Sequence, residues 1–130
     1  MDVARLKSID VFAQLGEDAM GTIAALASEV SVPAGKELVR EGDFSYDLLV
    51  IQEGTARVHR GGEHVADLGP GDIIGEMGVL ERAQRNATVT ATSSMVLVTL
   101  DRWDVKRLAK LAPPVVEDLK ALIQARRAGT

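Results

Sequence analysis

The feature that most constrains the fold is a series of short, β-branched segments between residues 30 and 100, each four to six residues long and bounded by turn signals. Many short strands at close, regular spacing are typical of an antiparallel sandwich, roll or barrel and not of a parallel α/β sheet. The predicted strands are Val30–Pro33, Glu37–Arg40, Leu48–Gln52, Ala56–Arg60, His64–Leu68, Thr88–Thr92 and Met95–Leu100.

Five of the connections between these segments are turn signals that contain glycine. Glycine adopts positive φ without strain and allows close backbone approach, so we expect one or both at these turns. The turns are Pro33-Ala34-Gly35, Glu41-Gly42-Asp43, Glu53-Gly54, Arg60-Gly61-Gly62 and Gly69-Pro70-Gly71-Asp72.

Helices are predicted on both sides of the strands. Apolar residues recur at helical spacing from Val3 to Leu15 and from Glu17 to Glu29, with Gly16 as the break. After the strands, Asp101 is expected to cap a helix to about Leu111, and Pro113-Pro114 to open a final helix to about Arg127. The chain is therefore predicted to be one domain over residues 1–130, with helices over about 3–29, a β-roll over about 30–100 and C-terminal helices over about 101–127.

Composition narrows the range of functions. The chain has 130 residues, no cysteine and a formal net charge of -4, which excludes disulfides and thiolate metal sites and argues against a broad nucleic-acid-binding face. The charge-free stretch Ala19–Ser28 is too short to span a bilayer, and Asp2 and Asp10 interrupt any signal-peptide pattern. We therefore expect a cytoplasmic protein that contacts neither nucleic acid nor membrane.

One segment, residues 73–89, breaks the alternating pattern around it. Glu76–Glu81 is long enough for a short helix that begins between glycines, and the free backbone N–H groups of such a start can bind a phosphate. Arg85 could bind two phosphate oxygens, whereas the Glu76 carboxylate suits sugar hydroxyls. The combination suggests a phosphorylated sugar or a nucleotide, although glycines near a short helix also occur for structural reasons alone.

This segment resembles the phosphate-binding cassette of the cyclic-nucleotide-binding domain, found in catabolite-activator-type regulators, protein kinase regulatory subunits and cyclic-nucleotide-gated channels. Three stretches within residues 74–89 fit the family pattern without a gap, and the turns listed above match at similar spacing. The matching stretches are Ile74-Gly75-Glu76, Met77-Gly78-Val79-Leu80 and Arg85-Asn86-Ala87-Thr88-Val89.

The resemblance implies a role for each matching residue. Glu76 would accept a hydrogen bond from the ribose 2′-hydroxyl, Arg85 would pair with the cyclic phosphate, and backbone N–H groups near Gly75, Met77, Gly78, Asn86 and Ala87 would complete the phosphate site. Val58, Ala66 and Leu68 would form the wall of the roll against the base.

Three residues depart from the family pattern. Ile74 replaces the usual aromatic residue, which we interpret as a change in core packing, and Gln84 stands where a proline often precedes the arginine. Asn86 occupies a position that helps to distinguish guanine from adenine, and an amide both donates and accepts, so it predicts neither purine cleanly.

The final helix has an apolar stripe that three arrangements could bury. By resemblance, Leu119, Leu122 or Ile123 could form a lid over the base. The same stripe could instead pack on the roll, or pair two subunits in a homodimer.

Other candidate sites are weaker. His59 and His64 flank a hairpin turn and are interpreted as solvent-facing, without the clustered ligands of a cupin-type metal enzyme. Trp103 is predicted to be a packing residue, and the basic residues Lys106, Arg107 and Lys110 to be a solvated helix face.

Taken together, the residues and the resemblance predict an α+β, mainly β chain: an antiparallel β-roll, jelly-roll-like, flanked by helices. It is expected to bind a cyclic mononucleotide, with cAMP preferred to cGMP as the ligand. It would act as a sensor that signals to an unknown downstream protein through its C-terminal helices. No catalytic residue, metal or cofactor is expected. The alternative is a protein-interaction domain with the same fold that binds no nucleotide.

Overall fold

The computed structural model describes residues 1–42, 48–74 and 87–127. Five helices and eight strands are described within these ranges. The helices are α1 (Val3–Lys7), α2 (Asp10–Ala13), α3 (Glu17–Leu26), α4 (Arg102–Leu111) and α5 (Pro113–Arg127). The strands are β1 (Ser28–Val32), β2 (Glu37–Val39), β3 (Leu48–Glu53), β4 (Ala56–Arg60), β5 (Glu63–Leu68), β6 (Ile73–Ile74), β7 (Thr88–Ala91) and β8 (Met95–Leu100).

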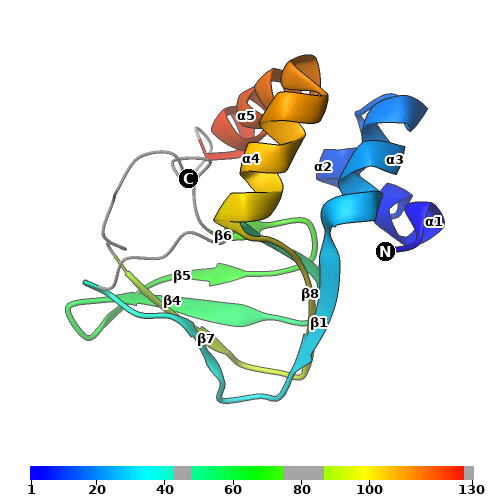
Figure 1. The fold of residues 1–130 in the computed structure, drawn as a ribbon. Helices are drawn as coiled ribbons and strands as arrows, with labels where there is room; N and C mark the ends of the chain where they lie inside the picture. Colours follow the sequence, from blue (N-terminus) through cyan, green and yellow to red (C-terminus); the bar gives the residue numbers. More distant parts are fainter. Residues whose placement is uncertain (43–47, 75–86, 128–130) are drawn as a thin grey trace.

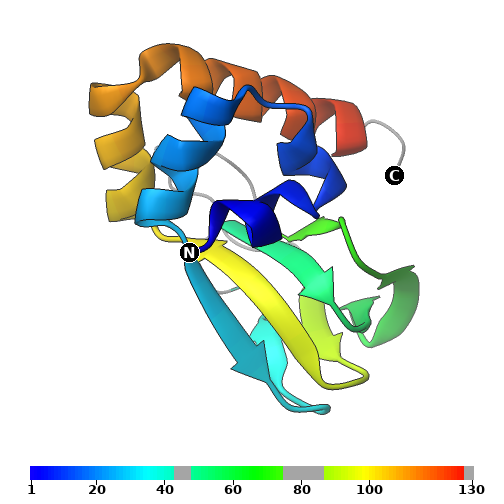
Figure 2. The same ribbon diagram turned by 90° about the vertical axis from the view of Figure 1, so that its right-hand side faces the viewer.

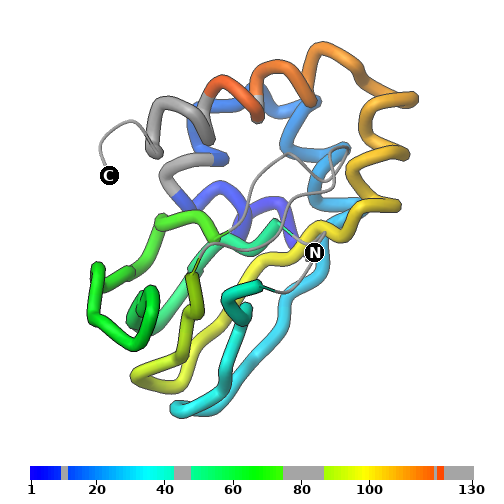
Figure 3. Tube along the Cα trace, turned by 90° about the vertical axis from the view of Figure 1, so that its left-hand side faces the viewer, coloured from blue at the N-terminus to red at the C-terminus, as the bar shows by residue number. Residues whose placement is uncertain are grey.

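The strands form two four-stranded antiparallel sheets. We call the sheet with the order β1-β8-β3-β6 sheet A, and the sheet with the order β2-β7-β4-β5 sheet B. The helices lie together at one end of the molecule, above the two sheets (Figures 1 and 2). The β1–β2 turn lies at the end of the roll that is farthest from the helices (Figure 3). The mainly β fold with two antiparallel sheets and flanking helices is the one predicted.

Strand β3 belongs to both hydrophobic cores of the molecule. Leu49 and Ile51 face sheet B and pack in a cluster that includes Val89 and Leu97. Leu48, on the opposite face of the strand, packs in the cluster between sheet A and the helices. Because successive side chains of a strand point to opposite faces, a central strand between two cores is apolar at every position, as β3 is from residue 48 to residue 51.

The prediction of one helix from Val3 to Leu15 is wrong, because the chain bends between α1 and α2. Ser8 ends α1, its hydroxyl donating to the Arg5 carbonyl at 2.6 Å, and Ile9 is extended. The apolar residues here recur every third position, which in a straight α-helix would rotate them by about 60° per step around its surface. The bend lets all of them enter the core: Leu6, Ile9, Phe12 and Leu15.

Two strand predictions also needed correction. Residues 28 and 29 belong to β1, where Ser28 pairs with Thr99, and not to the preceding helix, which ends at Leu26. Strand β6 was not predicted, since two residues carry no alternation; its pairing with Leu49 and Val50 is a long-range contact.

The starts of α4 and α5 were predicted correctly from residues next to each helix. Asp101 caps α4 in a reciprocal arrangement: its side chain accepts from the Asp104 N–H at 2.8 Å, and the Asp104 side chain accepts from the Asp101 N–H at 3.0 Å. Helix α5 begins at Pro113 as expected. The prediction that Trp103 is a packing residue is wrong, since the residue is 58% exposed on α4.

Candidate cyclic-nucleotide site

Most of the predicted phosphate-binding residues fall outside the described ranges. These are Gly75, Glu76, Met77, Gly78, Arg85 and Asn86, of which nothing structural is stated. The two flanks of the segment are described. Ile74 ends β6 and pairs with Leu49 in sheet A, whereas Ala87 directly precedes β7 of sheet B. The segment that carries the motif therefore connects one sheet to the other.

Both flanking residues are buried. Ile74 is 4% exposed and packs in the cluster between the two sheets, which confirms that the isoleucine in place of the usual aromatic residue serves core packing. Ala87 is 7% exposed. Both ends of the segment are therefore anchored in the core of the roll.

The three predicted wall residues share one face of sheet B. Val58 pairs with Ala66 on one side and with Val89 on the other. The side chains of Ala66, Val58 and Val89 therefore form a row across β5, β4 and β7. Leu68 lies in the next row, opposite Ala56. Val58 and Leu68 are half-buried against the cluster between the sheets, which shows that the row faces the interior of the roll. The structure therefore brings Val58, Ala66 and Leu68 together beside the strand that follows the motif.

Thr88 holds the end of the motif in place through a hydrogen bond on the outer face of sheet B. Its hydroxyl accepts a hydrogen bond from the Glu41 N–H at 3.0 Å. The Glu41 carboxylate in turn accepts from the Gly61 N–H, at 3.2 and 3.4 Å, at the tip of the β4–β5 hairpin. Sequence analysis missed this positioning role because Glu41 and Thr88 are 47 residues apart. The only available signal was the strand alternation that turns Thr88 away from the inward-facing Val89.

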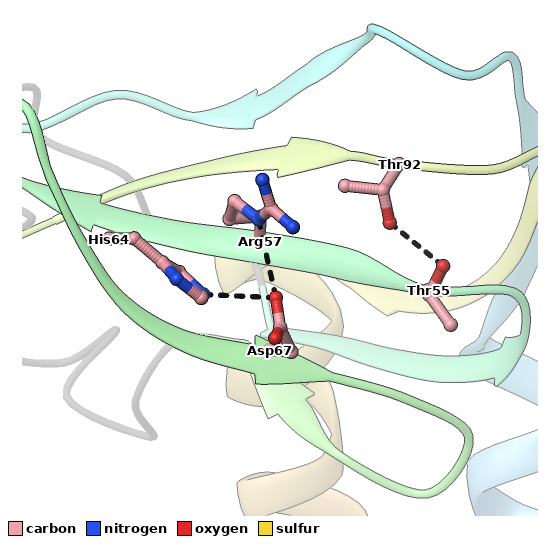
Figure 4. A network of polar contacts seen from close by, with 5 residues as sticks. All are labelled: Thr55, Arg57, His64, Asp67 and Thr92. Atoms are coloured by element: carbon pink, nitrogen blue, oxygen red, sulfur yellow. Dashed lines mark hydrogen bonds and ion pairs between the residues drawn. The ribbon is translucent and has the colours of Figure 1, made fainter.

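A polar network covers the outer face of sheet B (Figure 4). The Asp67 carboxylate accepts from Arg57 Nε at 3.3 Å and contacts His64 Nε2 at 3.0 Å. Desolvation acts to raise the pKa of Asp67, but the hydrogen bonds and charges of Arg57 and His64 outweigh it and hold the pKa below its usual value. These side chains lie on the face opposite the Val58 row, so the charges of the network are not directed into the roll.

The histidine pair does not form a metal site in the described structure. The His59 and His64 rings are 6.2 Å apart, His64 being exposed and His59 half-buried instead of fully solvent-facing. In the three described ranges, no group of three or more histidine, aspartate or glutamate side chains could hold a metal ion.

The predicted lid residues lie in α5, but the side chains of Leu119, Leu122 and Ile123 are outside the description. The start of the apolar stripe is described: Val116 is 3% exposed in the core beneath the helices. The first turn of α5 therefore packs on the rest of the molecule, and the choice between a lid and a dimer contact concerns only the later turns.

A groove of about 430 Å³ opens elsewhere, between β1 and β2. Its lining combines apolar residues of β1, β2, β3 and β8 with four charged residues, Lys36, Glu37, Asp101 and Asp104. Asp101 and Asp104 are already engaged in capping α4, and three of the four charged lining residues are negative. This lining offers little to a phosphate, so the groove is a poorer nucleotide site than the segment of residues 74–89.

None of the described helices combines the length and the apolar character that are needed to cross a membrane.

Comparison with known proteins identifies the family. Residues 29–111 match the sequence model of the cyclic nucleotide-binding domain. The cyclic AMP receptor protein of Thermus thermophilus is 34% identical over 99 residues, which cover 72% of this chain and 46% of that protein. A cyclic nucleotide-gated potassium channel of Rhizobium etli is 30% identical over 122 residues, covering 94% of this chain and 34% of the channel.

A solved structure agrees with the sequence matches. The regulatory domain of Toxoplasma gondii PKA, crystallised with cAMP, is 32% identical and aligns with a TM-score of 0.67, over 81% of this chain and 42% of that chain. This chain thus spans less than half the length of each of these relatives. The family match covers the segment 74–89, the wall strands and the helix α4, and on this basis the chain belongs to the cyclic nucleotide-binding domain family.

Proposed function

We propose that the chain binds a cyclic mononucleotide, cAMP in preference to cGMP, through residues 74–89. Two of the relatives carry cAMP in their names or titles, the receptor of Thermus thermophilus and the co-crystallised regulatory domain of Toxoplasma gondii. The chain also has both charged residues of the motif, Glu76 and Arg85. A non-binding domain of the same fold would need neither.

The chemistry of the site follows from the residue types. The Arg85 guanidinium donates two parallel hydrogen bonds to phosphate oxygens, and the Glu76 carboxylate accepts from the ribose hydroxyl. Backbone N–H groups around Met77, Gly78, Asn86 and Ala87 complete the anion site, as at any segment that exposes unpaired donors. The purine packs on the wall of Val58, Ala66 and Leu68.

The observation that carries the proposal is the row of apolar side chains across β5, β4 and β7. This row faces the interior of the roll. Val89 belongs to the row and is also the last residue of the phosphate-binding motif, so the row adjoins the motif directly. A purine needs an apolar surface near the phosphate site, and Val58 and Ala66 of this row are only half-buried, which leaves them partly accessible.

The proposed response is a change in the helical layer, with the chain acting as a cytoplasmic regulator and not as a catalyst. Ligand contacts at residues 74–89 stabilise a closed arrangement in which the later turns of α5 cover the base, through Leu122 or Ile123. Nucleotide shifts this balance only by its difference in affinity for the two arrangements. The signal passes to a downstream protein, or to a second copy through α5.

Calorimetric titration with cAMP and, in parallel, with cGMP tests the proposal, after denaturing extraction of a separate sample has shown whether nucleotide co-purified. Arg85→Ala removes the charge-assisted contact with the phosphate and should weaken cAMP binding by about 1.5–3 kcal/mol. Arg57→Ala is the matched control, because it removes the same charge from the outer face of β4 and should leave the affinity unchanged.

Equal affinity of Arg85→Ala and the parent protein would remove residues 74–89 from the phosphate site. No heat with either nucleotide, and no nucleotide in the extract, would favour the interaction-domain alternative. Tighter binding of cGMP would keep the site but reverse the purine preference, with Asn86 the first residue to substitute.

A further inference from the structure

The single tryptophan of the chain stands on the exposed side of α4. Trp103 is 58% exposed, and two cations lie over its ring: Arg102 Cζ at 4.7 Å and Lys106 Nζ at 4.8 Å from the ring centre. A large aromatic side chain left in water forgoes the free energy of burial, and tryptophan and arginine are the residue types that most often anchor interfaces.

Three cations share the face of α4 that carries Trp103. Lys106, Arg107 and Lys110 follow Trp103 by three, four and seven residues, so they lie on the same side of the helix, and all are exposed. We call these four residues the basic aromatic face. None of its cations pairs with a carboxylate among the residues that the structure describes. The one acidic residue of α4, Asp104, is engaged in the cap.

The opposite side of α4 fixes this orientation. Val105 and Leu108 are fully buried in the core beneath the helices, so α4 cannot rotate to bury Trp103 without exposing them. Leu111, at the end of the helix, is 71% exposed and adds an apolar side chain next to the basic aromatic face. The face is therefore held toward solvent by the core packing of the same helix.

We propose that the basic aromatic face of α4 docks a short acidic segment of a partner protein, with an apolar side chain of that segment packed on Trp103. Charge complementarity supports this occupant, since the face is wholly basic in a chain with a net charge of -4. The size of the face supports a short segment: the eight helical residues from Trp103 to Lys110 extend about 12 Å, the length of three or four residues in extended conformation. A nucleic-acid duplex or an anionic bilayer would extend beyond the face and meet the acidic remainder of the molecule.

Trp103 provides the direct measurement, because its emission comes from a single residue. The full chain is titrated with a blocked synthetic peptide of alternating Glu and Leu, and with a second peptide in which Gln replaces every Glu. The acidic peptide should move the emission to shorter wavelength and saturate, and the effect should weaken as salt screens the charges. The Gln peptide should give no saturable change.

Charge variants separate the face from the general charge of the protein. Lys106→Gln with Lys110→Gln should weaken binding of the acidic peptide about tenfold, the equivalent of two exposed ion pairs. Lys7→Gln with Lys36→Gln changes the net charge equally at other exposed lysines and should leave binding unchanged. Fluorescence anisotropy of a labelled peptide extends the test to Trp103→Ala, which should also weaken binding.

Three results would overturn the proposal. The first is no saturable response to the acidic peptide, and the second is equal loss of binding in the two double variants. The third is tighter binding of phosphatidylserine vesicles or duplex DNA than of the peptide, which would assign the face to a different class of partner.

Discussion

Gly54 joins the two sheets at the point where the chain passes from β3 to β4. Its φ is +94°, and a Cβ atom there would lie 2.4 Å from the Ser94 carbonyl oxygen. Another passage between the sheets, from β7 to β8, packs against this one: the Thr55 N–H donates to Ser93 Oγ at 3.0 Å, and the Thr55 and Thr92 hydroxyls are 2.8 Å apart (Figure 4). Only glycine combines that φ with such a close approach.

Substitution of Gly54 should therefore be costly. Gly54→Ala imposes both a left-handed conformation and a backbone clash, and should lower the free energy of unfolding by about 2–4 kcal/mol in urea denaturation. Gly21→Ala is the control, since Gly21 lies in α3 with open space around it and alanine favours a helix by up to about 1 kcal/mol. Equal stability of Gly54→Ala and the parent protein would contradict this role for the turn.

At the scale of the element, α4 depends on a local cap. Asp101→Ala removes the side-chain acceptor for the Asp104 N–H and should lower the free energy of unfolding by about 1 kcal/mol. Asp101→Ser keeps an acceptor oxygen and should retain most of the stability. Urea denaturation followed by circular dichroism measures both, and a loss in Asp101→Ser as large as that in Asp101→Ala would show that the charge matters more than the cap.

Elements with local signals could be predicted from the sequence, and elements made by distant contacts could not. The start of α4 follows from Asp101 and that of α5 from Pro113, both within a few residues of the helix. The bend at Ser8 arises because the apolar side chains from Leu6 to Leu15 must all pack in the core. Strand β6 is formed by its pairing with β3, which is distant in sequence. The exposure of Trp103 depends on which side of α4 packs against the core.

The same distinction applies to the candidate site. The phosphate-binding motif is contiguous in sequence, so Glu76 and Arg85 could be named without a structure, and their roles stay predictions. The wall of Val58, Ala66 and Leu68 needed the resemblance, and the strand register then placed the three on one inner face. The Glu41–Thr88 contact joins residues far apart in sequence and carries no local pattern.

At the scale of the whole molecule, β3 makes the roll and the helices one cooperative unit. Leu48→Ala leaves a cavity on the helical face of β3 and should lower the free energy of unfolding by about 2–5 kcal/mol. Because β3 also pairs with β8 in the middle of sheet A, amide protection in helices and strands should fall together.

Native-state hydrogen exchange measures this coupling. The control is Val65→Ala, at a half-exposed position on the edge strand β5, which should change stability by less than about 0.5 kcal/mol. Loss of protection in the helices alone, with the strands unchanged in Leu48→Ala, would show that the two layers unfold separately.

The order of strands in the two sheets leaves four described edges, and each is unsuited to pairing with another molecule. Strands β2 and β6 are only three and two residues long, while β1 carries Glu29 paired with Arg5, and β5 carries Asp67 with its cationic neighbours. Short or charged edges discourage edge-to-edge aggregation. A roll that is open on both sheets can thus remain monodisperse at the concentrations that calorimetry requires.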